Sequence, residues 1–147
     1  MNESWTGGQY SIYRALLGAF LVVHFAMLLP YGPEVFGKGG LLASASLSPY
    51  FGVLPNPLAH FDSPAAVTLF LGTGVLCGLA LAIGWFDRVG AVLAALLLGW
   101  LFQRNPLIAN PSLPLLGFLL VLHACVPTRP HGSLAALRAG GADPSWR

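Results

Sequence analysis

Three ionisable side chains, Arg14, His24 and His123, lie within apolar stretches of this chain. Histidines on two separate apolar segments could ligate one haem iron from its two sides. If the segments cross a bilayer, however, His24 lies about 9 Å from one boundary, and His123 lies close to the opposite boundary. The rings would then be separated along the membrane normal by roughly 15 Å, which disfavours a shared haem. We interpret each histidine as hydrogen-bonded to a neighbouring helix or to water.

The polar residues in and beside the apolar segments fall into two groups by their expected depth. One group comprises Arg14, His123 and the turn Asp87–Arg88. The other comprises His24, His60, Gln103, Arg104, Asn105 and Asn110. Within the second group, His24, Arg104, Asn105 and Asn110 form a candidate cofactor-binding cluster for a lipid or a quinone. The alternative is that each group is only an interfacial cap with snorkelling arginines.

Other kinds of site find little support in the sequence. The acidic residues, Glu3, Glu34, Asp62, Asp87 and Asp143, are too scattered for a carboxylate metal site. The segment 37–40 lacks the spacing of a phosphate loop. No hydrolase motif is present, so we expect no catalytic residues and no metal. The net charge of +2, with scattered basic residues, indicates no nucleic-acid partner.

The elements that would hold these residues are strongly apolar. Hydrophobic residues make up 56% of the chain and charged residues only 8%. The run 63–85 contains no ionisable group except the thiol of Cys77, and about 20 such residues suffice to cross a bilayer. The sequence therefore predicts an integral membrane protein, in contact with membrane lipids.

The apolar pattern predicts an all-α fold, a four-helix bundle with spans at about 10–29, 64–84, 89–105 and 107–126. The first run continues to Pro30 without a cleavage pattern, which favours a retained span over a signal peptide. The last two spans are short, and a re-entrant pair would also fit them. Glycines and prolines fill the connection 31–62, which predicts a long outer loop without regular helix. Residues 1–127 form one domain, and 128–147 form a weakly structured tail with a short helix near 133–139.

The arginines set the expected orientation. Four spans place Arg14, Arg88, Arg129, Arg138 and Arg147 at one face, against Lys38 and Arg104 at the other. The positive-inside rule then predicts that both termini are cytoplasmic and that the long loop is outside.

Small residues recur every fourth position on two of the predicted spans. Gly74, Gly78 and Ala82 do so on the second, and Ala91, Ala95 and Gly99 on the third. Such stripes allow helix backbones to approach closely in lipid. We expect these two spans to pack against each other as a tight hairpin, with a dimer interface as the alternative.

Two segments carry a family resemblance that covers roughly residues 10–127. The segment 103–110, QRNPLIAN, leads into a Leu-rich helix ending at Pro127, and YRALLG opens the first span at Tyr13. Together with the loop phrase GVLP, they resemble the horizontally transferred transmembrane (HTTM) domain, which is related to vitamin K-dependent gamma-carboxylase. DoxX-like four-helix proteins share the outline. The chain departs from the carboxylase in its length and in having only one lysine, Lys38, which lies in a loop, so carboxylase activity is not expected. The resemblance implies a membrane fold in a bacterial inner membrane and a polar pocket around Arg104 and Asn105.

Two functions remain open from the sequence. The first is a small non-catalytic subunit that packs within a larger membrane complex with other membrane proteins. The second is a DoxX-like, redox-linked protein that binds a lipid or a quinone at the outer face. A transporter is a weaker third option, because discontinuous-helix repeats are missing from the sequence.

Overall fold

The computed structural model describes residues 7–108, 110 and 112–146, and this part of the chain is all-helical. The long helices are α1 (Gly7–Leu28), α3 (Pro64–Ile83), α4 (Asp87–Arg104) and α5 (Ser112–Cys125). The short ones are α2 (Gly32–Phe36) and α6 (Leu134–Arg138). Four 3₁₀ turns are η1 (Ala45–Leu47), η2 (Pro57–Ala59), η3 (Pro106–Ile108) and η4 (Pro144–Trp146).

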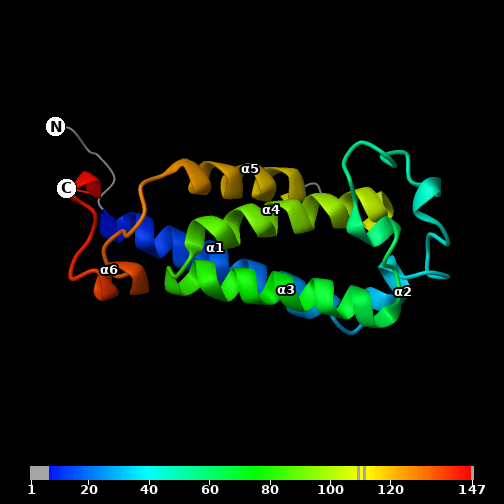
Figure 1. The fold of residues 1–147 in the computed structure, drawn as a ribbon, viewed down its shortest axis with the longest axis horizontal. Helices are drawn as coiled ribbons and strands as arrows, with labels where there is room; N and C mark the ends of the chain where they lie inside the picture. Colours follow the sequence, from blue (N-terminus) through cyan, green and yellow to red (C-terminus); the bar gives the residue numbers. More distant parts are fainter. Residues whose placement is uncertain (1–6, 109, 111, 147) are drawn as a thin grey trace.

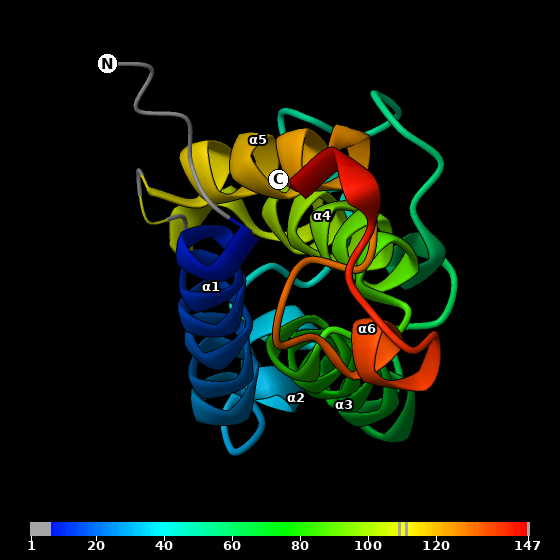
Figure 2. The same cartoon turned by 90° about the vertical axis from the view of Figure 1, so that its left-hand side faces the viewer.

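The four long helices lie side by side and give the molecule an elongated shape (Figure 1). The view along the bundle shows α1, α3, α4 and α5 around a common centre (Figure 2). The fully buried centre is formed by Leu21, Phe25, Leu71, Leu81, Ala91, Ala94 and Leu120. The segment 128–146 lies at one end, and the loop 37–62 lies at the opposite end (Figure 1). The two ends of the bundle are therefore covered by different segments of the chain, and each end has its own set of polar residues.

The closest helix pair is α1 with α3, and glycines set its distance. A Cβ on Gly78 would lie 2.8 Å from the backbone nitrogen of Val22 and 3.0 Å from the carbonyl oxygen of Gly18. A Cβ on Gly74 would overlap the ring of Phe25. The glycines of the stripe on α3 thus face α1, which corrects the expected pairing of that stripe with α4.

The expected hairpin of α3 and α4 does form, through other residues. A Cβ on Gly90 would lie 3.2 Å from the carbonyl oxygen of Cys77, and the neighbouring Ala91 is completely buried. Gly99, by contrast, has open space around its Cβ position. Only part of the predicted stripe on α4 therefore contributes to helix packing.

A three-residue turn joins α3 to α4. Gly84 adopts a left-handed conformation (φ 70°) and donates its N–H to the last carbonyls of α3. A side chain at this position would also collide with the guanidinium of Arg14 and with Ser133. Phe86 is left-handed as well (φ 50°), so the chain reverses direction within the turn. The reversal places the first residue of α4 beside the C-terminal end of α3.

The observed helix ends differ from the expected spans in two places. Residues 106–108 form a 3₁₀ turn, and α5 begins only at Ser112, where the Asn110 side chain accepts the Ser112 N–H at 3.0 Å. Pro106 and Asn110 thus delay the helix that was expected from residue 107. The connection 31–62 contains the five-residue α2, which has Pro33 in its first turn, although no regular helix was expected there.

The segment 128–146 is a docked cap rather than a weakly structured tail. The expected short helix is present as α6, whose Ser133 side chain accepts the N–H of Ala136 at 3.0 Å. Ala135 donates its N–H to the carbonyl oxygen of Gly84 at 3.1 Å. Ser11 on α1 donates its hydroxyl to the carbonyl of His131. The cap therefore joins the ends of α1 and α3.

All four long helices expose apolar side chains along their outer faces. On α1 the exposed residues Ile12, Leu16, Phe20, Val23 and Met27 form a stripe along the whole helix. Comparable residues are Leu69, Leu76, Leu79 and Ile83 on α3, Val89, Val92, Leu93 and Leu96 on α4, and Leu115, Phe118, Val121 and Leu122 on α5. Helices α1 and α3 are long and apolar enough to cross a membrane.

Candidate functional site

Three consecutive polar side chains at the end of α4 hold the loop between α1 and α3. Gln103 donates to the carbonyl oxygens of Tyr50 and Leu54, both at 2.9 Å. Arg104 donates to those of Gly37 at 3.2 Å and Leu42 at 3.0 Å, and Asn105 donates to that of Val35 at 3.0 Å. We call Gln103, Arg104 and Asn105 the loop clamp. The irregular loop leaves carbonyls without helical partners, and the clamp supplies their donors.

The loop clamp is buried, and an ion pair between Arg104 and Asp62 supports it. Arg104 is fully buried, and its guanidinium nitrogen lies 3.8 Å from a carboxylate oxygen of Asp62. Asn56 of the loop donates to the carbonyl oxygen of Trp100 at 2.9 Å. Arg104 is thus a buried donor to loop carbonyls, and the alternative of an arginine snorkelling into lipid headgroups does not describe this side chain.

The candidate cluster at this end is assembled only in part. His24 and Asn105 line one cavity of about 30 Å³, together with Phe36, Phe102 and other apolar residues. That volume holds about one water molecule. Asn110 instead bonds the backbone and hydroxyl of Ser112, and His60 is exposed. The geometry favours a structural role for Arg104 and Asn105, and cofactor binding by this cluster stays a prediction.

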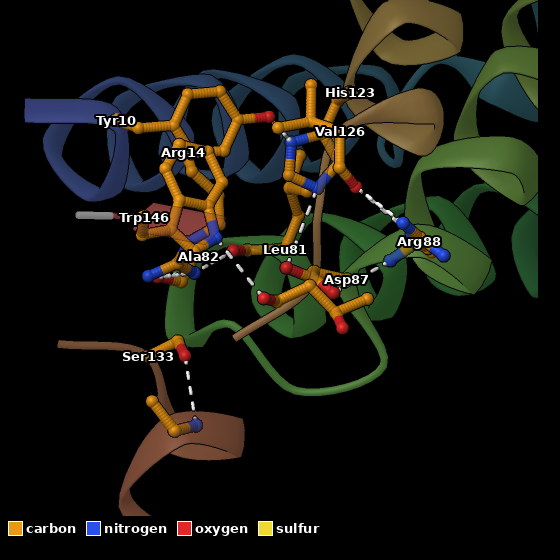
Figure 3. A network of polar contacts seen from close by, with 12 residues as sticks. Tyr10, Arg14, Leu81, Ala82, Asp87, Arg88, His123, Val126, Ser133 and Trp146 are labelled. Carbon is orange, nitrogen blue, oxygen red and sulfur yellow. Dashed lines mark hydrogen bonds and ion pairs between the residues drawn. The ribbon is translucent and has the colours of Figure 1, made fainter. Parts of the chain in front are cut away.

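A second polar centre lies at the opposite end, where α1, α4 and α5 converge (Figure 3). The hydroxyl of Tyr10 lies 2.6 Å from Nδ1 of His123, and Nε2 of His123 lies 3.6 Å from a carboxylate oxygen of Asp87. All three side chains are buried. Asp87 is the first residue of α4, where a carboxylate is stabilised by the helix dipole. We call Tyr10, His123 and Asp87 the phenol–imidazole–carboxylate chain, in which Tyr10 and His123 share a hydrogen bond and the carboxylate faces the imidazole at a distance too long for one.

Two arginines beside this chain cap the C-terminal ends of helices. Arg14 donates to the carbonyl oxygens of Leu81 and Ala82 at the end of α3. Arg88 donates to that of Val126, just beyond α5, at 2.6 Å. All three carbonyl groups lie at or just beyond the partly negative C-terminal ends of helices, where a cation is favourable. Arg14 and Arg88 therefore stabilise the ends of two helices, in addition to any effect on the orientation of the protein in a membrane.

A cleft of about 320 Å³ adjoins the phenol–imidazole–carboxylate chain. Its lining residues are Tyr10, Tyr13, Leu119, Leu122, His123, Val126 and Trp146. Trp146 comes from the cap and stacks on Tyr10 with ring centroids 4.6 Å apart. The cleft thus combines apolar and aromatic walls with one polar pair.

The cap that supplies Trp146 is closed by an ion pair. Asp143 accepts hydrogen bonds from the hydroxyl and the N–H of Ser145, and Arg129 donates to it at 3.3 Å. The pKa of the Asp143 carboxyl is held below its usual range, mainly by the hydrogen bonds from Ser145 and to a smaller extent by Arg129. The Trp146 indole donates to the carbonyl of Thr128 at 3.2 Å.

The sequence placed some of these residues together and missed others. Arg14, His123, Asp87 and Arg88 were expected near one face, and the structure brings them to one end. Tyr10 was missed, although its position one helical turn before Arg14 puts both on the same side of α1. Nothing in the sequence indicated that Trp146 would lie beside Tyr10, because its position depends on how the cap folds back onto the helices.

Within the described residues, no group of three or more His, Cys, Asp or Glu side chains could hold a metal ion. No known family model, curated protein or solved structure matches the chain. The functional argument therefore depends on the geometry of this molecule.

Proposed function

We propose that the chain is an integral membrane protein in which α1, α3, α4 and α5 form a membrane-embedded four-helix bundle. Helix α1, with 22 residues, is about 33 Å long, close to the thickness of a bilayer core. Only 28% of its apolar window and 33% of that of α3 are buried inside the protein. A core helix of a soluble protein would be mostly covered, whereas lipid would cover these outer faces.

The ends of the bundle support the same proposal. The cap end carries Tyr10, Tyr13, Trp85 and Trp146, and the loop end carries Tyr31, Tyr50 and Trp100. Aromatic residues of this kind favour the membrane interface. The charges fit an orientation with the cap in the cytoplasm and the outer loop on the other side. The resemblance to HTTM and DoxX-like proteins, and with it a bacterial inner membrane, is part of this proposal.

Within the membrane, we propose that the protein is an accessory subunit that packs against another membrane protein. The observation that carries this proposal is a groove of about 260 Å³ between α4 and α5. It is lined by Ala95, Leu98, Gly99, Phe102, Leu113, Pro114 and Gly117. A Cβ on Gly99 or Gly117 would meet no atom within 4 Å, so these glycines are not needed for packing within the chain. Small residues on an open helix face allow a second helix to approach closely in lipid.

The experiment fills the groove without disturbing the bundle. The full chain is purified from its native membrane in a mild detergent, and the mass of the complex is measured. Gly99→Trp and Gly117→Trp should reduce the complex to the monomer mass while leaving the melting temperature near that of the wild type. Gly72→Trp is the matched control, because Gly72 on α3 also has open space but lies outside the groove. A monomeric wild type, or equal effects of all three variants, would contradict the proposal.

The second candidate is a lipid- or quinone-binding protein at the loop end. The shared cavity of His24 and Asn105 favours it, but a headgroup would have to enlarge a space of about 30 Å³. Lipid extraction and an optical spectrum of the purified protein test it directly. Retained quinone that is lost in His24→Leu would support this function, and its absence from the wild type would count against it.

A further inference from the structure

The loop between α1 and α3 carries a run of exposed apolar side chains. Residues 39–61 contain no Asp, Glu, Lys or Arg. Within this stretch, residues 47–54, which we call the apolar segment, expose Leu47, Tyr50, Phe51, Val53 and Leu54. Apolar side chains concentrated in this way on a protein surface mark a contact with another protein or with a membrane.

We propose that the apolar segment lies in the lipid interface of the same bilayer that holds the four-helix bundle, beside the C-terminal end of α4. The partner of this surface is therefore lipid, at the depth where headgroups meet acyl chains. The inference rests on the membrane-embedded bundle proposed above. It depends neither on the accessory-subunit function nor on which side of the membrane the loop occupies.

The loop extends over the space that lipid would occupy. Seen along the bundle, it reaches sideways past α4 and beyond the outline of the four long helices (Figure 2). A loop that only closed the end of the bundle would stay within that outline. A loop that extends in this direction instead lies over the lipid beside the bundle.

Hydrogen bonds to α4 fix the depth of the apolar segment. Gln103 donates to the carbonyl oxygens of Tyr50 and Leu54, and Asn56 donates to that of Trp100, all at 2.9 Å. Trp100 lies about one turn, or roughly 6 Å, before the end of α4. Helix α4, with 18 residues, is about 27 Å long, so its end lies near the boundary of a hydrocarbon core of about 30 Å. The apolar segment is thus tied to α4 at the depth of the interface.

The backbone of the apolar segment is prepared for contact with lipid. Phe51 donates its N–H to the carbonyl oxygen of Ser48 at 3.0 Å, and Val53 donates to that of Tyr50 at 3.2 Å. The side chain of Gln103 is a second donor to the Tyr50 carbonyl. Unpaired backbone groups are costly next to lipid. Because these groups have partners within the protein, the apolar side chains can contact acyl chains without that cost.

The composition of the loop determines the kind of lipid contact. Because residues 39–61 lack Lys and Arg, the apolar segment has no fixed cation for an anionic headgroup. Tyr50 is an amphipathic aromatic residue of the kind that favours headgroup depth. The contact is therefore driven by burial of apolar surface, and it should form equally well with zwitterionic and with anionic lipids.

The test measures the depth of single fluorescent reporters. The full chain, with both native cysteines replaced, carries the fluorophore NBD on one introduced cysteine and is placed in phosphatidylcholine nanodiscs that hold one chain each. Val53→Cys reports on the apolar segment, Lys38→Cys on an exposed position of the same loop outside it, and Leu76→Cys on the exposed face of α3. The quenchers are lipids with a nitroxide at a shallow or a deep position, and iodide in the water.

The three reporters should respond differently. The Val53 reporter should be quenched most by the shallow nitroxide and only weakly by iodide. The Lys38 reporter should be quenched mainly by iodide, and the Leu76 reporter mainly by the deep nitroxide. Replacing part of the phosphatidylcholine by phosphatidylglycerol should leave the result for Val53 unchanged.

Phe51→Asp tests whether apolar contact holds the segment in lipid. In the Val53→Cys background it should increase quenching by iodide and decrease quenching by the shallow nitroxide, because burying a carboxylate in lipid is costly. Leu137→Asp is the matched control, since Leu137 is also exposed but lies on α6 at the opposite end of the bundle. Deep quenching of the Leu76 reporter shows that the bundle of each variant is intact.

The outcomes separate this inference from the membrane-embedded bundle. A Val53 reporter that iodide quenches as strongly as Lys38, while Leu76 stays deep, would overturn the inference alone and leave the surface to a protein partner. A Leu76 reporter that no lipid nitroxide quenches would contradict the bundle, and the inference with it.

Two further results would also overturn the inference. An unchanged Val53 signal in an intact Phe51→Asp chain would show that contacts within the protein, rather than lipid, shield the segment. Quenching of Val53 by the shallow nitroxide only in the presence of phosphatidylglycerol would show an electrostatic contact instead of an apolar one. The depth of Val53 in the chain without Phe51→Asp decides the proposal even if that variant does not fold.

Discussion

Three arginines in this protein, the buried Arg14 and Arg104 and the exposed Arg88, act mainly as donors to backbone carbonyls. Arg14 and Arg88 bond the ends of α3 and α5, and Arg104 bonds two carbonyls of the outer loop. A planar guanidinium can reach several carbonyls at once, whereas an ammonium is a point charge on a flexible stem. The arginine side chains therefore determine local stability at both ends of the bundle.

Arg104→Lys should lower the melting temperature and destabilise the protein by about 1.5–3 kcal/mol, because at least one carbonyl loses its charged donor. The measurement is thermal unfolding in detergent. Arg138→Lys serves as the control, since Arg138 is exposed and its guanidinium lies over the Trp85 ring at 5.0 Å. A melting curve for Arg104→Lys that matches the wild type would show that the clamp does not depend on the guanidinium.

Asp143 should make the docking of the cap depend on pH. Its pKa is lower in the folded cap than in the unfolded chain, where it is about 3.9. The stabilisation is therefore fully present above about pH 4, and it is lost as the pH falls through the lowered pKa. Fluorescence of Trp146, with the other tryptophans replaced by phenylalanine, should report this release. Asp143→Asn should remove the pH dependence, and an unchanged titration in that variant would assign it to another group.

At the scale of the elements, glycine positions decide which helices are neighbours. Gly18 and Gly78 bring the backbones of α1 and α3 together, whereas Gly72, Gly99 and Gly117 have open space around them. All five lie in apolar helices and look equivalent in the sequence. Their roles differ because only some of them face another backbone.

Gly78→Ala should separate α1 from α3, since the added Cβ would lie 2.8 Å from the nitrogen of Val22. We expect a loss of at least about 1 kcal/mol, of the order seen for overpacked cores, despite the better helix propensity of alanine. Gly72→Ala on the same helix should be neutral or stabilising. Equal melting temperatures for the two variants would mean that the α1–α3 contact tolerates expansion.

At the scale of the whole molecule, the two ends have different chemistry. The cap end joins α1, α3, α4 and α5 through the Tyr10–His123–Asp87 chain, the two helix-capping arginines and the docked segment 128–146. The loop end is held by the clamp at the end of α4. In the proposed membrane orientation the cap faces the cytoplasm.

Topology can be measured in a background in which both native cysteines, Cys77 and Cys125, are replaced. A cysteine at Arg138 should resist an impermeant thiol reagent in intact cells, and a cysteine at Leu41 in the outer loop should react. Both positions are exposed, so accessibility within the fold is matched. The reverse pattern would invert the proposed orientation.

The sequence by itself determined the all-helical class and the lengths of α1 and α3, because these follow from long apolar runs. It also grouped Arg14, Asp87 and His123, because depth along a helix can be counted at 1.5 Å per residue. It could not decide which face of α3 meets α1, since small residues occur on several faces. Nor could it place Trp146 on Tyr10. Those contacts join residues far apart in the chain, and only the tertiary structure fixes rotation about each helix axis and the path of the cap.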